Sequence, residues 1–128
     1  MESATLTAAS AYLRAQRARE LIKREMIEAL DRFDVIIMPS SPTVSPTIES
    51  ATGSPGGYYQ GRLDLSRRRY TSPAALAGLP SLSVPCGFSD EGLPMAIQII
   101  GKPFAEETLF QVGHAYEQAT DWHAREPG

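Results

Sequence analysis

The tripeptide Gly-Leu-Pro occurs twice in this chain, at Gly78–Pro80 and at Gly92–Pro94, and each copy precedes a short apolar run. Proline fixes φ and lacks the N–H group that a sheet ladder needs, so it is tolerated at the start of a strand and not inside one. Each copy therefore predicts a turn that begins a strand, and the two strands are expected at Ser81–Val84 and Met95–Ile100. The chain has to build a sheet around this pair.

The two predicted strands differ in the polarity of their faces. In the first strand, Leu82 and Val84 alternate with serines, which is the two-residue period of a half-buried strand. In the second strand, apolar residues occur in both alternating sets, which are Met95, Ile97 and Ile99 on one face and Ala96, Gln98 and Ile100 on the other. Such a strand needs cover on both faces, which favours an interior position in an α/β sheet over the open face of an antiparallel sheet.

The rest of the chain predicts helices that can supply this cover. Apolar residues recur near the helical period over Ala4 to Phe33, so a helix is expected at about Ala8–Arg32, and another at about Glu106–Ala119. Between these helices, the apolar run Val35–Met38 is bounded by breakers and predicts a third strand. A short helix is expected to begin with Pro73 at its first position, where the missing N–H group costs nothing.

Two further features concern connections. Residues 40–66 are rich in Pro, Gly and Ser and predict a long loop, which is a type of segment that is often functional or disordered in compact domains. The connection CGFSDE between the two Gly-Leu-Pro strands is longer than a tight two-residue turn, so a direct hairpin and an intervening strand both remain open.

Composition excludes several functional classes. A chain of 128 residues with a net charge of −3 predicts one segment, 1–128, that is soluble and has no nucleic-acid footprint. We find no apolar stretch of membrane-spanning length and no secretory signal, so no membrane partner is expected. The single cysteine fits a reducing compartment, and a cytoplasmic location is expected.

Three runs of the sequence resemble the C-terminal portion of the amidase signature family, and they are YLRAQRARELIKREMIEALDRFDVIIMPSSPT, TSPAALAGLPSLSVPCG and GLPMAIQIIGKPFAEETL. The resemblance implies an α/β fold, namely the C-terminal part of that family's mixed sheet with covering helices, about three strands and two to three helices. In the family, the loop after the first of these strands lines the substrate pocket, so Ser41 and Thr43 are candidate substrate-binding residues. The alternative is that both hydroxyls only hydrogen-bond their own backbone in turns.

The family's chemistry uses two serines and a lysine in a serine-rich active site, and no matching segment occurs in this chain. We therefore predict no catalytic residue here. His114, His123 and Cys86 lack the spacing of a zinc site, so neither a metal nor another cofactor is expected. Cys86 with His114 as its base is a possible nucleophilic pair, but a structural role for Cys86, in a Pro-Cys-Gly turn at the end of a strand, is favoured.

The resemblance thus implies the C-terminal part of an amidase that hydrolyses a carboxylic amide to an acid and ammonia. The chain alone is expected to be inactive and to need an N-terminal amidase portion or self-association, with a small-molecule amide as substrate. Two alternatives remain, a non-catalytic binding or assembly module and a fragment of the A-type component of a tRNA-dependent amidotransferase. Arg68 stands where the glutamine-using branch is expected to carry an acidic residue, which argues against the second. The run Arg67–Arg69 is interpreted as solvated, with anion recognition as the alternative.

Overall fold

The computed structural model describes residues 8–46 and 65–126. The elements, in chain order, are α1 (Ala9–Arg32), β1 (Val35–Pro39), α4 (Leu65–Ala77), β2 (Ser81–Phe88), β3 (Pro94–Gly101), α5 (Glu106–Ala119) and the short 3-10 helix η2 (Trp122–Ala124). The three predicted strands and the two predicted long helices are confirmed, and their ends differ from the expected ends by a few residues at most. The predicted α/β fold class is therefore confirmed.

The strands form one sheet in the order β1-β3-β2, and both neighbouring pairs are antiparallel. Ile100 of β3 lies opposite Ile36 of β1 on one side and opposite Ser81 of β2 on the other. The strand with apolar residues on both faces is thus the central one, as its sequence predicts. The open question about the last two strands is also resolved, because β2 and β3 are direct neighbours joined by a hairpin.

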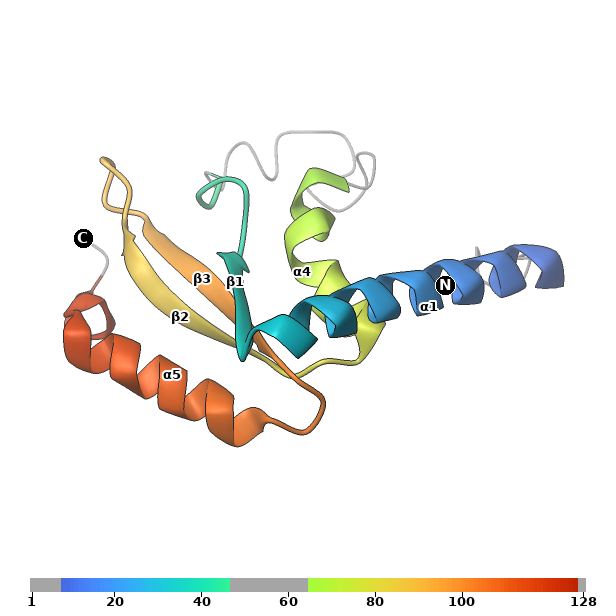
Figure 1. Cartoon of the computed structure of the whole chain (residues 1–128). Coiled ribbons are helices and arrows are strands. Elements are labelled where there is room, and N and C mark those ends of the chain that lie inside the picture. The colour runs from blue at the N-terminus through green and yellow to red at the C-terminus, as the bar shows by residue number, and fades with distance from the viewer. Residues whose placement is uncertain (1–7, 47–64, 127–128) are drawn as a thin grey trace.

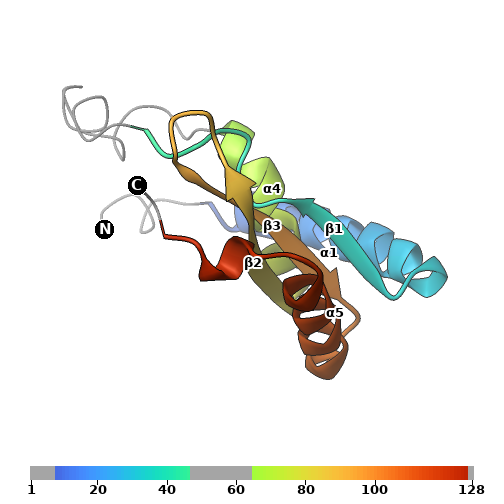
Figure 2. The same cartoon turned by 90° about the vertical axis from the view of Figure 1, so that its left-hand side faces the viewer.

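Helices cover both faces of the central strand (Figures 1 and 2). On one face, Ile100 packs with Leu30 of α1 and with Ala74 and Ala77 of α4. On the other face, Ile99 packs with Leu109 of α5. Both isoleucines are at most 1% exposed. Each side of β3 therefore has its own core, and burial of apolar area on both sides is the main force that holds the helices to the sheet.

The hairpin between β2 and β3 is closed by Ser89. Its backbone N–H donates to the carbonyl of Leu93 at 2.9 Å, and its hydroxyl accepts from the N–H groups of Glu91 and Leu93. Gly92 has a φ of 79°, which glycine adopts without steric cost. The first Gly of the second Gly-Leu-Pro copy is therefore required by the turn.

Three predicted boundaries need correction. The helix α4 begins at Leu65, so Pro73 lies inside it and not at its first position, and the predicted loop 40–66 ends at least two residues early. Residues 47–64 of that loop lie outside the described residues. Packing of Ala74 and Ala77 into the core outweighs the backbone hydrogen bond that Pro73 cannot make. In addition, β2 continues through Cys86 to Phe88, with an irregular register between Pro85 and Gly87.

The connection between β3 and α5 is a tight turn with an unusual residue in it. The N–H of Ala105 donates to the carbonyl of Lys102 at 3.1 Å, and this bond closes a four-residue turn with Pro103 and Phe104 at its centre. Phe104 has a φ of 60° and is the non-glycine residue with positive φ in the described part of the chain. For an aromatic residue, such a backbone conformation costs about 1–3 kcal/mol.

The C-terminal end of the described chain folds against β2. Trp122 contacts Phe88 with ring centroids 6.4 Å apart, and the guanidinium of Arg125 lies 4.5 Å above the Trp122 ring. Arg125 also pairs with Asp121 at 2.7 Å and holds the pKa of that carboxyl below its usual value. Across residues 8–46 and 65–126, we find no helix with both the length and the apolar composition needed to cross a bilayer.

Candidate functional site

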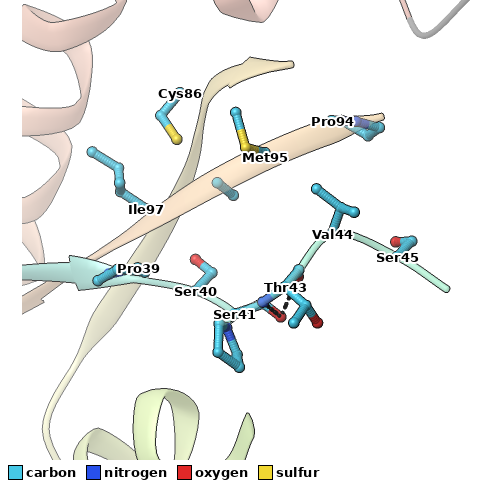
Figure 3. Close-up of a pocket in the computed structure, with 12 residues that line it drawn as sticks. Pro39, Ser40, Ser41, Thr43, Val44, Ser45, Cys86, Pro94, Met95 and Ile97 are labelled. Carbon is cyan, nitrogen blue, oxygen red and sulfur yellow. Dashed lines mark hydrogen bonds between the residues drawn. The ribbon is translucent and has the colours of Figure 1, made fainter. Parts of the chain in front are cut away.

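A pocket of about 470 Å³ opens where the chain leaves the sheet after β1 (Figure 3). Its walls are the loop after β1, the first half of β3 and the irregular part of β2. We call it the loop pocket, and the described residues that line it are Pro39, Ser40, Ser41, Pro42, Thr43, Val44, Ser45, Cys86, Pro94, Met95, Ala96 and Ile97. Strand ends and loops on a rigid sheet are common positions for binding residues.

Ser40 attaches the start of this loop to the sheet. Its backbone N–H donates to the carbonyl of Ala96 at 3.0 Å, which extends the β1–β3 ladder by one residue. Its hydroxyl lies 3.2 Å from the hydroxyl of Ser83 on β2, on the far side of the central strand. The loop is therefore tied to both of the other strands before it turns away.

Ser41 and Thr43 both line the loop pocket, and a local turn orients them. The Ser41 hydroxyl donates to the carbonyl of Thr43 at 2.7 Å and also accepts from the N–H of Thr43 at 3.4 Å. The predicted backbone turn therefore exists for Ser41, and it lies within a pocket wall. The two interpretations are thus compatible, because a hydroxyl held by its own turn still presents its remaining lone pair to a ligand.

Cys86 lines the opposite wall and is half-buried. It occupies the irregular position of β2 between Pro85 and Gly87, inside the strand, which corrects the prediction of a turn at the strand's end. The extra residue of a bulge turns its side chain away from the regular ladder. Burial raises the pKa of the Cys86 thiol, and its proposed base, His114, is exposed on α5 and does not line the pocket.

We therefore expect Cys86 to be unreactive and dispensable for chemistry. Because its pKa is raised, the fraction of thiolate at neutral pH is lower than for a free cysteine, so alkylation by iodoacetamide should be slow and should accelerate only at a more alkaline pH. Cys86→Ala should lower the free energy of unfolding by about 1 kcal/mol and leave the activity of an assembled amidase within a few-fold. Loss of activity by orders of magnitude in a folded variant would contradict this prediction.

The walls of the loop pocket combine hydroxyl groups with apolar side chains, and none of its described lining residues is charged. Hydroxyls and backbone amides can hydrogen-bond a neutral amide, while Met95, Val44 and Ile97 offer apolar contact. The described walls hold no lysine or carboxylate that could serve as a general base. Elsewhere in residues 8–46 and 65–126, no three His, Cys, Asp or Glu side chains gather as metal ligands would.

Sequence reasoning missed the polar residues that support the pocket. Ser81 and Ser83 share one face of the sheet with Gln98, because Ser83 lies opposite Gln98 in the register. The Gln98 side-chain N–H donates to the Ser81 hydroxyl at 3.1 Å, and its buried Oε1 atom has no hydrogen-bond partner among the described residues. The alternation of the two serines was visible in the sequence, but their cross-strand partners depend on pairing.

Comparison with protein families and curated proteins gives one consistent result. The family model described as Amidase matches residues 1–110. The chain is 46% identical over 116 residues to the A-type component of the glutamyl-tRNA(Gln) amidotransferase of Microcystis aeruginosa. That alignment includes 91% of this chain and 23% of the relative. The chain thus spans about a quarter of the length of the curated relatives that it matches.

Solved structures give the same fold. The chain is similar to the A-type component of the glutamyl-tRNA(Gln) amidotransferase of Thermotoga maritima, with 34% identity, a TM-score of 0.63, and coverage of 79% of this chain and 21% of that one. It is also similar to a bacterial aryl acylamidase of the amidase signature enzymes, with 27% identity and a TM-score of 0.76. That alignment covers 94% of this chain and 25% of the acylamidase.

Proposed function

The chain belongs to the amidase family, and on this premise we propose that it forms the C-terminal part of an amidase that hydrolyses a carboxylic amide to an acid and ammonia. The observation that carries the proposal is the loop pocket, which the resemblance predicts at the end of β1 and which contains Ser41 and Thr43. The nucleophilic serine, the second serine and the lysine base would come from an N-terminal amidase portion. A cytoplasmic location is retained as part of the proposal.

The exposed surface of the chain supports the need for such a portion. Large apolar side chains that are more than half exposed lie on α1, on β1 and its approach, and around α5, and they are Tyr12, Leu13, Leu21, Phe33, Ile37, Phe104 and Phe110. The edges of β1 and β2 have no strand partner among the described residues. Proteins normally pair or cover edges and apolar areas of this kind.

A second candidate is the A-type component of a tRNA-dependent amidotransferase, which the names of the curated relatives favour. Two observations weigh against it. Arg68 stands at the position where the glutamine-using branch is expected to be acidic, and the described walls of the loop pocket carry no charge to bind an amino-acid headgroup. If glutamine is hydrolysed more efficiently than simple neutral amides by about 100-fold or more in the assembled enzyme, the second candidate is the better assignment.

Substitutions in the loop test whether it binds the substrate. In an assembled enzyme, Ser41→Ala and Thr43→Val should each raise KM about 5- to 20-fold, because each removes a hydrogen bond worth about 1–1.5 kcal/mol, while kcat should change by less than about 3-fold. Ser45→Ala, in the same pocket wall but without a predicted role, serves as the control. Steady-state ammonia release measures both constants. A large fall in kcat alone would mean that Ser41 takes part in the chemistry.

A further inference from the structure

The turn that contains Phe104 breaks a local rule of backbone geometry. With Pro103 at its second position and a hydrogen bond from Ala105 to Lys102, the turn resembles type II, which needs positive φ at its third position and prefers glycine there. The chain instead has phenylalanine at this position, with a φ of 60°. A strained, bulky residue is retained where the surroundings or the function require it, so its environment has to be examined.

The surroundings of Phe104 do not explain its presence. Its side chain is 94% exposed, more than any other large apolar side chain that the structure describes. It therefore contributes little to the core, and burial within this chain does not offset the strain of its backbone. Phe110, on α5, is 65% exposed and provides a natural comparison.

A second concavity lies beside Phe104. It has a volume of about 350 Å³ and is lined by residues 77–80, Lys23 of α1, and Pro103, Phe104 and Glu106. We call it the Phe104 hollow. Because Ser81 pairs with Ile100, the segments before β2 and after β3 meet at the end of the sheet that is opposite the loop pocket. An exposed ring, a hollow, and an ammonium and a carboxylate at its rim together form a small surface suited to protein contact.

We propose that Phe104 and the Phe104 hollow are the anchor by which an N-terminal amidase portion docks on this chain. The inference rests on the proposed function. The partner would insert an apolar side chain into the hollow, enclose the Phe104 ring, and present opposite charges to Lys23 and Glu106. The strained turn holds the ring outward before binding, so that little conformational freedom is lost on docking.

The length of the missing partner supports this occupant. The chain covers 23% of its curated relative, so about three-quarters of such an amidase lies outside the matching segment. A portion of that size can reach both ends of the sheet, contributing catalytic groups at the loop pocket and an anchor at the Phe104 hollow. Anchoring at the opposite end adds affinity without placing bulky side chains in the pocket.

Phe104→Gly separates docking from stability, because glycine removes the ring and suits the positive φ. The chain is co-expressed with the N-terminal portion of the related Microcystis aeruginosa amidotransferase component, and the purified complex is diluted to measure its apparent Kd. We expect Phe104→Gly to weaken the complex by about 30-fold or more while the urea midpoint of the isolated chain stays unchanged or rises. Phe110→Ala, the matched control, should change the Kd by less than about 3-fold.

The outcomes separate the two claims. If the wild-type chain neither binds the N-terminal portion nor yields amidase activity with it, the proposed function fails and the anchor fails with it. If the wild-type complex forms and is active but Phe104→Gly binds equally well, only the anchor is refuted. If Phe104→Gly converts a dimer of this chain into a monomer and leaves the Kd for the portion unchanged, the occupant is a second copy and the proposal is overturned.

Discussion

The isolated chain is expected to release no ammonia from simple amides, and the same chain assembled with an N-terminal amidase portion is expected to do so about 1,000-fold or more faster than the uncatalysed reaction. Acyl transfer needs an activated hydroxyl, a proton shuttle and donors for the oxyanion. The loop pocket supplies hydroxyls and apolar walls, but its described lining has no base. A pocket without a nucleophile–base pair binds its ligand and leaves the amide intact.

The assay compares the chain alone, the N-terminal portion alone and the co-purified complex, with a neutral amide such as propionamide or benzamide as substrate. Turnover by the complex only is the expected result, and its solution mass establishes the stoichiometry. Substantial turnover by the isolated chain would contradict the proposed function and would make Ser41 or Cys86 the first nucleophile to substitute. A stable complex with no turnover on any amide would favour the alternative of a non-catalytic binding module.

Ile100→Ala is expected to lower the free energy of unfolding by about 3–4 kcal/mol, which is a large share of the roughly 5–15 kcal/mol typical of a domain. Ile100 is 0% exposed and is the residue of the central strand that contacts both α1 and α4 through Leu30, Ala74 and Ala77. Shortening it removes apolar burial and leaves a cavity that the two helices cannot close without moving.

Ile37→Ala is the matched control for this prediction. Ile37 belongs to the same sheet and lies opposite Ile99, but its side chain is 57% exposed. It should therefore cost less than about 0.5 kcal/mol in the isolated chain. Urea unfolding followed by circular dichroism measures both variants. Equal losses would mean that the sheet has no covered face at β3, in conflict with the two cores. In the complex with an N-terminal portion, a larger cost for Ile37→Ala would indicate that the portion covers β1.

Much of the fold could be read from local patterns. The two Gly-Leu-Pro copies mark where strands begin, because proline excludes itself from a strand interior wherever it occurs. The apolar residues on both faces of Met95–Ile100 require a central strand with cover on each side, and the structure has both. The helical periods of Ala9–Arg32 and Glu106–Ala119 are also properties of short stretches of sequence. The resemblance to amidases added the position of the loop pocket.

Only the tertiary structure decided which segments lie together. The direct β2–β3 hairpin, the Ser40–Ser83 contact and the bulge at Cys86 depend on pairing across many residues, and no local pattern specifies a register between distant strands. The helix α4 runs through Pro73 because its small residues fill a core that forms only when α1 and β3 are in place. The sequence by itself determined the elements, since propensity and periodicity act within a few residues. The structure decided their partners and the outward position of Phe104, since burial and exposure are set by the whole chain.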